Sequence, residues 1–131
     1  MIYDINLSPV GWYYASYLLR FVEMADPDKD SDDKPFTAWE NTVLVRAKDM
    51  DEAHAKVTAL ARKASTIYRG GEEGLRVRWK FVGITELLPV YEPLEDGAEI
   101  AWTNHGDHKL SDLKKLVTPK RAFKRRVAKS I

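Results

Sequence analysis

The stretch that decides the fold is residues 75–91, LRVRWKFVGITELLPVY. In its first half basic and apolar residues alternate, with Val77, Trp79 and Phe81 on one side of the chain. This period of two is typical of a half-buried β-strand, because successive side chains point to opposite faces of a sheet. Beyond Gly83 both faces become apolar, which predicts a bulge or bend at the glycine and a strand covered more fully. We therefore expect this stretch to be a central strand.

Two further strands precede it. Trp12–Glu23, WYYASYLLRFVE, is rich in aromatic residues and contains no glycine or proline, so it predicts a long strand. Residues 36–47, FTAWENTVLVRA, predict a second strand, with Trp39, Asn41, Val43 and Val45 on one face. The intervening residues 24–35 contain two prolines and five aspartates, a composition typical of a loop. The two strands are expected to pair as a hairpin.

A helix follows the second strand. Asp49 and Glu52 have the spacing of a capping box, in which each side chain accepts a hydrogen bond from a backbone N–H of the first turn. Apolar residues then recur at helical spacing as far as Ile67 and Tyr68. Glycine-rich residues 69–74 are expected to end this helix and turn the chain into the central strand.

The resulting prediction is an α+β fold of order ββαββ. After the Asp96-Gly97 turn signal, residues 98–103 are expected to form a fourth strand. A hairpin followed by a returning helix places the third strand beside the first, which gives a four-stranded antiparallel sheet of spatial order 2-1-3-4. One helix covers one face. The other face is expected to need cover, from the C-terminal segment or a second subunit, for its apolar residues Trp12, Tyr14, Leu18, Leu44, Val82, Ile84 and Leu88.

Length and charge divide the chain into two parts. The 131 residues are enough for one domain, which we place at 1–111, followed by a basic helical extension at 112–131 with short helices at 111–117 and 118–128. Residues 1–111 carry 13 basic and 19 acidic residues, whereas residues 112–131 carry 8 and 1. The sequence has no cysteine, no apolar run of membrane-spanning length and no signal peptide, so a cytoplasmic protein without membrane contact is expected.

Few residues suggest catalysis, and we predict no catalytic residues, no metal and no cofactor. Asp26, Asp28 and Asp30 open like a calcium loop, but the sixth and twelfth positions are serine and threonine, and a solvated acidic loop is the better interpretation. The loop residues His105, Asp107 and His108 could contact a metal, but a polar loop is the better interpretation. Three strand carboxylates, Glu40, Glu86 and Glu99, could face a cleft, but cross-strand pairing with Arg46, Arg76, Arg78 or Lys80 is expected instead.

Two charged surfaces are the candidates for binding. Carboxylates in loops and turns are predicted to face a protein partner: Asp26, Asp28, Asp30, Asp32, Asp33, Glu72, Glu73, Glu95 and Asp96. Basic residues of the C-terminal segment could contact nucleic acid phosphates: Lys120, Arg121, Lys124, Arg125 and Arg126. The alternative for the basic segment is a solvated or partner-docked helix that offsets the acidic domain.

Five short motifs resemble a family of small bacterial proteins known only as a domain of unknown function. They are W-Y-x-A (Trp12, Tyr13 and Ala15), W-E-N-T-V-L (39–44), D-x-x-E-A (49–53), W-K-F-V-G (79–83) and E-D-G-x-E-I (95–100). The resemblance covers residues 12–102 and concerns core and turn positions, so it implies a fold and no catalytic residues. In size and charge the chain also looks like the immunity proteins that bacteria encode beside antibacterial toxins.

Three function classes follow. We expect a non-enzymatic protein-binding module, with an immunity protein that occludes the active or substrate-binding surface of a cognate toxin as the specific form. The alternative is a nucleic-acid-associated protein that acts through its basic C-terminal segment. A small ligand-binding domain or enzyme is third, because the sequence shows no convergent polar set. A homodimer is the other way in which the apolar sheet face could be covered.

Overall fold

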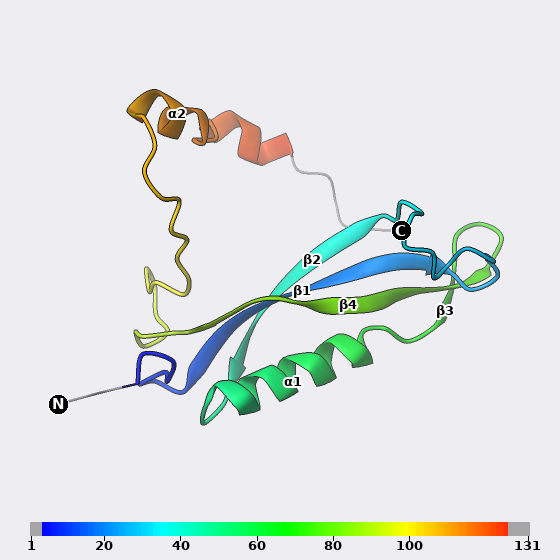
Figure 1. Cartoon of the computed structure of the whole chain (residues 1–131), viewed down its shortest axis with the longest axis horizontal. Helices are drawn as coiled ribbons and strands as arrows, with labels where there is room; N and C mark the ends of the chain where they lie inside the picture. Colours follow the sequence, from blue (N-terminus) through cyan, green and yellow to red (C-terminus); the bar gives the residue numbers. More distant parts are fainter. Residues whose placement is uncertain (1–3, 126–131) are drawn as a thin grey trace. The chain divides into compact units, whose positions relative to one another are not determined.

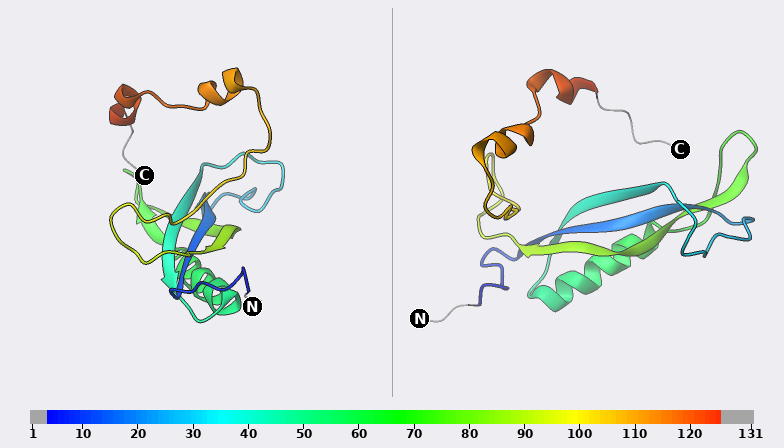
Figure 2. Two further views of the ribbon diagram at one scale, coloured as in Figure 1. Left: turned by 90° about the vertical axis from the view of Figure 1, so that its left-hand side faces the viewer. Right: turned by 45° about the horizontal axis from the view of Figure 1, so that its top comes forward.

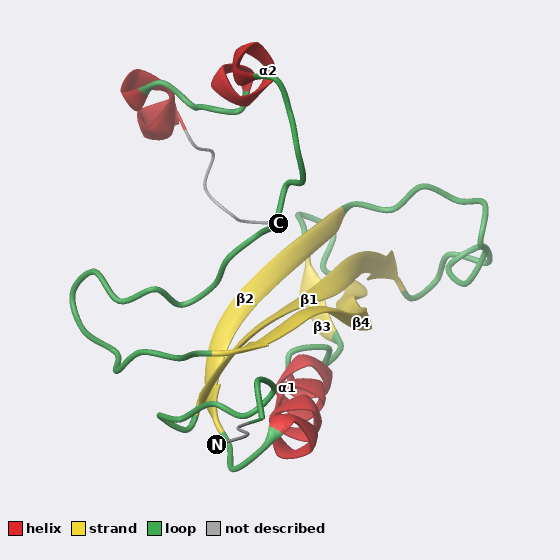
Figure 3. Cartoon of the chain, turned by 60° about the vertical axis from the view of Figure 1, so that its left-hand side comes forward, coloured by secondary structure: helices red, strands yellow, loops and turns green. Residues whose placement is uncertain are grey.

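The computed structural model describes residues 4–125, which divide into two compact units between Ala101 and Trp102. The first unit contains the strands β1 (Trp12–Glu23), β2 (Ala38–Arg46), β3 (Tyr68–Gly70) and β4 (Leu75–Pro89) and the helix α1 (Met50–Lys63). All strand pairs are antiparallel, in the order β2-β1-β4-β3. α1 lies on one face of this sheet (Figures 1 and 3). The α+β class, the long central strands and the single covering helix are therefore confirmed.

The core lies between the sheet and α1. The odd-numbered residues of β1 point towards the helix, and Tyr13 and Ala15 are fully buried there. Val45 of β2 and Val57 of α1 join them in one cluster, against which Trp79 and Phe81 of β4 pack. The predicted inward positions of the three long strands are thus confirmed. Fully burying side chains of this size stabilises the fold by about 1.5–3 kcal/mol each.

β4 bulges on both sides of Gly83, as the sequence predicted. Against β1 the register moves from Leu18↔Gly83 to Leu19↔Phe81 on one side, so that Val82 has no direct partner. A second shift leaves Thr85 unpaired in the same way. These bulges turn Ile84 towards the core, where it packs beside Tyr17. The prediction that Ile84 belongs to the opposite face was therefore wrong, because a bulge reverses the alternation of a strand.

α1 begins where the capping box predicted and ends earlier than expected. The Asp49 carboxylate accepts a hydrogen bond from the Glu52 N–H, and the Glu52 carboxylate accepts one from the Lys48 N–H. The helix ends at Lys63, and the buried Ser65 hydroxyl then donates to the Ala61 carbonyl of the last turn. Ile67 and Tyr68, predicted to be helical, lie beyond this end. Threonine, isoleucine and tyrosine at 66–68 favour extended backbone, which explains the difference.

The fourth strand is not the one predicted. Residues 98–103 form no strand, although the predicted turn is present and the Ala98 N–H donates to the Glu95 carbonyl. Their hairpin partner would be residues 89–94, in which Pro89 and Pro93 have no N–H to donate. Tyr68–Gly70 instead pairs with the start of β4 through a turn. The spatial order is therefore 2-1-4-3 and not 2-1-3-4.

The sheet face opposite α1 is partly covered by its own side chains. The guanidinium of Arg46 lies 4.8 Å from the ring centre of Trp12, and the hydroxyls of Ser16 and Thr42 share a hydrogen bond. Val82 and Leu44 remain exposed, by 56% and 37%. Cover of this remaining apolar surface by the C-terminal segment or by a second subunit stays a prediction.

The second unit contains two short helices in its described part. They are α2 (Leu110–Lys115) and the 3-10 helix η1 (Lys120–Arg125), at positions close to those predicted. Ala122 N–H donates to the Pro119 carbonyl at the start of η1. The end of the second predicted helix, after residue 125, lies outside the described residues. No helix of the described chain is long and apolar enough to cross a membrane.

Candidate partner-binding surfaces

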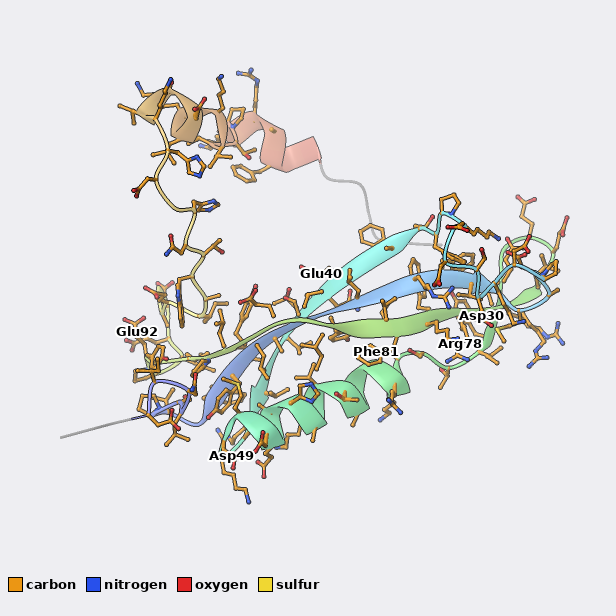
Figure 4. The ribbon with its side chains drawn as sticks, viewed as in Figure 1. Asp30, Glu40, Asp49, Arg78, Phe81 and Glu92 are labelled. Atoms are coloured by element: carbon orange, nitrogen blue, oxygen red, sulfur yellow. The ribbon has the colours of Figure 1, made fainter. Side chains whose placement is uncertain are left out.

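The aspartate-rich loop between β1 and β2 is tied to two strands of the sheet through Asp30. Arg20 of β1 and Lys80 of β4 are direct cross-strand neighbours, an arrangement in which like charges repel. One oxygen of Asp30, Oδ1, lies 3.3 Å from Nη2 of Arg20 and 3.1 Å from Nζ of Lys80. The Asp30 carboxylate thus offsets the repulsion between two strands and ties the loop to both. Figure 4 labels Asp30 at the end of the sheet where β1 leads into this loop.

The ion pairs of Asp30 affect its protonation. The hydrogen bond from Lys80 is the main cause that lowers the pKa of this carboxyl below its ordinary value of 3.8, and the hydrogen bond from Arg20 adds to it. Asp30 therefore remains a carboxylate in acid that would protonate an isolated aspartate.

Other contacts hold the loop along its length. Arg20 Nη1 donates to the Lys29 carbonyl at 2.6 Å, and its guanidinium lies 4.5 Å from the ring centre of Phe36. Asp26 forms an ion pair with Lys34, and its Oδ1 accepts a hydrogen bond from the Asp28 N–H. The predicted partner-binding residues Asp26 and Asp30 are therefore engaged within the protein. Asp28, Asp32 and Asp33 are exposed and form no ion pair with any residue of the described chain.

The structure brings some of the predicted carboxylates together and separates others. The Met24 N–H at the start of the loop donates to the Arg76 carbonyl, so the loop lies beside the β3–β4 turn that carries Glu72 and Glu73. Glu95 and Asp96 follow the opposite end of β4, a strand of 15 residues that spans roughly 45 Å. Figures 1 and 2 show the two ends. We name the exposed carboxylates at the loop end the acidic tips: Asp28, Asp32, Asp33, Glu72 and Glu73.

Basic residues lie on β3 and β4, next to the turn that carries part of the acidic tips. Arg69 and Arg76 are cross-strand neighbours on β3 and β4, and Arg69 donates to the Gly74 carbonyl at 3.1 Å. They line a groove of about 380 Å³ together with Glu23, Glu73 and Leu75. This end of the sheet therefore has carboxylates at its loop tips and guanidinium groups along its strands.

The candidate metal ligands do not converge. Among the residues that the structure describes, no three His, Cys, Asp or Glu side chains are placed to hold one metal ion. His108 Nε2 lies 2.5 Å from the carbonyl oxygen of His105, a contact within the loop itself. Asp30, the third residue of the calcium-like pattern, is occupied by Arg20 and Lys80.

The strand carboxylates pair differently from the prediction. Glu40 accepts a hydrogen bond from the Thr85 hydroxyl at 3.0 Å, across β1. Lys80, one of the four expected basic partners of these carboxylates, binds Asp30. The register explains this difference, because Glu40 lies opposite Leu18 whereas Lys80 lies opposite Arg20. Within residues 4–125, Glu40, Glu86 and Glu99 form no ion pair.

The basic residues of the C-terminal segment lie on η1 as far as residue 125. Lys120 and Arg121 are exposed. Lys124 and Arg125 belong to the same short helix, and Arg126 lies outside the described residues. The ion pair of this unit's described part is between Lys115 and Asp112, at 3.6 Å. Lys120 and Arg121 therefore keep their charges available to solvent.

Sequence reasoning missed the roles of Arg20 and Lys80. The signal was that two basic residues lie directly opposite each other on β1 and β4, within reach of one of the loop's five aspartates, and it can be read only once the register is known. A groove between β2 and α1 was missed as well, because Leu60, which lines it, shares the apolar helical spacing of the buried residues of α1. Leu60 is in fact 44% exposed.

The fold defines a class: an α+β domain with one helix packed on a four-stranded antiparallel sheet. The chain belongs to the family described as "Domain of unknown function (DUF4288)", whose model matches residues 12–102. The matched region contains the sheet, α1 and the turn at 95–97, and it ends at the boundary between the two units. No curated protein and no solved structure matches the chain.

Proposed function

We propose that this chain is a non-enzymatic protein-binding module that presents the acidic tips to a basic partner. The observation that carries this proposal is the pair of salt bridges from Asp30 to Arg20 and Lys80, which ties the loop to two strands. A loop held in this way needs less ordering on binding than a free one, so its remaining carboxylates can form contacts at a smaller entropic cost. The exposed Asp28, Asp32 and Asp33 supply those carboxylates.

The specific partner we propose is a bacterial toxin whose active or substrate-binding surface is occluded. A nuclease toxin needs a basic groove for its phosphate substrate, and carboxylates can occupy the places of the phosphates. Electrostatic attraction of this kind raises the association rate and disfavours wrong partners. The small size of the chain and the excess of acidic residues in residues 1–111, 19 against 13 basic, support this proposal.

The test uses a toxin encoded next to this chain's gene and measures association by surface plasmon resonance. Changing Asp28, Asp32 and Asp33 to Asn removes tip charges and leaves the Asp26 and Asp30 contacts in place. We expect the association rate at low salt to fall about tenfold or more, with a small change in dissociation. The matched control changes Glu95 to Gln and Asp96 to Asn at the opposite end, which should leave the rate unaltered.

Two outcomes would count against the proposal. Equal association rates for the loop variant and the wild type would exclude the loop as the steering surface. The absence of any neighbouring toxin gene and of any protein partner would count against the whole class. Circular dichroism of both variants shows whether the fold is retained.

A second candidate function is nucleic-acid association through the C-terminal segment. The exposed Lys120 and Arg121, which have no carboxylate partner within the described part of the chain, favour it. Such binding depends on phosphate contacts and carries no base preference by itself.

A further inference from the structure

β2 is an edge strand whose backbone groups are available for pairing. Two backbone hydrogen bonds at the ends of the β1–β2 pair show which residues bond to β1: the Phe21 N–H donates to the Thr37 carbonyl, and the Ala47 N–H donates to the Gly11 carbonyl. With the β1–β2 register, they indicate that the odd-numbered residues of β2 form the hydrogen-bonded pairs with β1. In an antiparallel ladder the intervening residues direct their N–H and C=O groups away from the partner strand. The even-numbered residues therefore present these groups at an edge that no other strand of residues 4–125 covers: Ala38, Glu40, Thr42, Leu44 and Arg46.

A groove runs beside this edge, on the α1 side. It has a volume of about 380 Å³, and its lining is Val45, Arg46, Lys56, Ala59, Leu60 and Lys63. Val45 is only 6% exposed. Leu60, by contrast, is 44% exposed, although its helical neighbours Val57 and Ala61 are fully buried. An additional strand at the edge would direct every second side chain to this side of the sheet. The groove is thus placed to receive an apolar side chain of such a strand.

The charges around the groove are of one sign. Its lining includes Lys56 and Lys63 of α1 and no acidic residue, whereas the guanidinium of Arg46 lies over Trp12 on the other face of the sheet. The ammonium of Lys56 donates to the outward carbonyl of Arg46, which shows that a cation on α1 reaches the backbone edge. Lys63 has no ion-pair partner among residues 4–125. Carboxylates in the added strand would complement these cations.

We propose that the free edge of β2 and the groove beside it bind an extended acidic peptide segment of another protein as an added strand. The peptide backbone pairs with Thr42 and Leu44, an apolar side chain enters the groove against Leu60, and a carboxylate two residues along the peptide, on the same face, contacts Lys63. Main-chain hydrogen bonds supply affinity in this mode of recognition, and alternate side chains supply specificity. This site is separate from the acidic tips and does not depend on them.

Charge argues against a second copy of this chain as the occupant. Two copies joined through their β2 edges would bring the lysines of the two α1 helices towards each other. Like charges across an interface disfavour such a pair. An acidic peptide meets no such repulsion.

The test measures fluorescence anisotropy of a labelled short peptide with the repeat Val-Thr-Glu-Thr, added to the full chain, because valine and glutamate two residues apart point to the same face of a strand. Leu44→Pro removes the outward N–H of an edge residue, a position where proline is tolerated because this N–H pairs with no strand. Leu44→Ala is the matched control, since it removes the same side chain and keeps the N–H. We expect Leu44→Pro to weaken binding about three- to tenfold relative to Leu44→Ala, as loss of one backbone hydrogen bond predicts.

Two further measurements test the charge and the occupant. Lys63→Glu should weaken binding of the glutamate peptide about tenfold, and the same peptide with lysine in place of glutamate should bind the wild type far more weakly. No binding of the glutamate peptide, or equal affinities for Leu44→Pro and Leu44→Ala, would overturn the proposal. Binding that resists both substitutions would assign the peptide to the basic C-terminal segment instead. A wild-type dimer that Leu44→Pro dissociates, seen by analytical ultracentrifugation, would make a second copy the occupant and equally overturn it.

Discussion

Ser8 is the residue whose removal tests the packing of the N-terminal segment most directly. Its hydroxyl donates to the Val90 carbonyl at 2.5 Å and accepts from the Trp12 N–H at 3.1 Å. It also accepts a longer hydrogen bond, 3.3 Å, from the Val10 N–H. Ser8 and Val90 are 7% and 1% exposed, so water cannot easily replace these contacts. The Ser8 side chain thus links the residues that lead into β1 with Val90, which follows the end of β4.

The expected effect of Ser8→Ala follows from these contacts. A buried carbonyl left without a donor costs about 1–3 kcal/mol, and the lost N–H contacts add to this. We expect the free energy of unfolding to fall by about 2–3 kcal/mol, against a typical total of about 5–15 kcal/mol. The midpoint of thermal unfolding should fall by roughly 10 °C.

Urea denaturation followed by tryptophan fluorescence measures the change. Ser31→Ala is the control, because Ser31 is exposed and its hydroxyl accepts only from the nearby Asp33 N–H. That variant should lie within about 0.5 kcal/mol of the wild type. A similar small change for Ser8→Ala would show that the Val90 carbonyl finds another donor, and it would refute this reasoning.

Three other predictions concern the loop, the turns and the C-terminal segment. Because the folded state lowers the pKa of Asp30, its stabilising contribution is present above 3.8 and is lost as the pH falls below that value. The difference in urea midpoint between wild type and Asp30→Asn should therefore narrow in that acid range, and a constant difference would contradict the ion pairs. Gly71→Ala, at φ 76°, should cost about 1–2 kcal/mol in urea unfolding, whereas Gly83→Ala, which has open space and no positive φ, should change stability little. If the C-terminal segment binds DNA, changing Lys120, Arg121, Lys124, Arg125 and Arg126 to Gln should reduce the slope of log affinity against log salt by about 4, and absence of binding at low salt would remove this function.

The sequence alone determined the features that depend on near neighbours. The capping pair Asp49 and Glu52 placed the start of α1 correctly, because both hydrogen bonds close within one turn. Alternation identified Val77, Trp79 and Phe81 as inward residues, since the side-chain period of a strand is local. The bulge at Gly83 and the pairing of β4 beside β1 also followed from local pattern and chain order.

The tertiary structure decided which segments pair and which charges meet. The fourth strand is Tyr68–Gly70 because a partner was available at the start of β4, whereas Pro89 and Pro93 removed the donors for residues 98–103. Asp30 differs from Asp28 only in its position along the loop, yet the loop's path places it between Arg20 and Lys80. The residues next to Asp30 in the sequence do not specify such contacts. These ion pairs join segments that lie far apart in the sequence, and they form only when the sheet has assembled in one register.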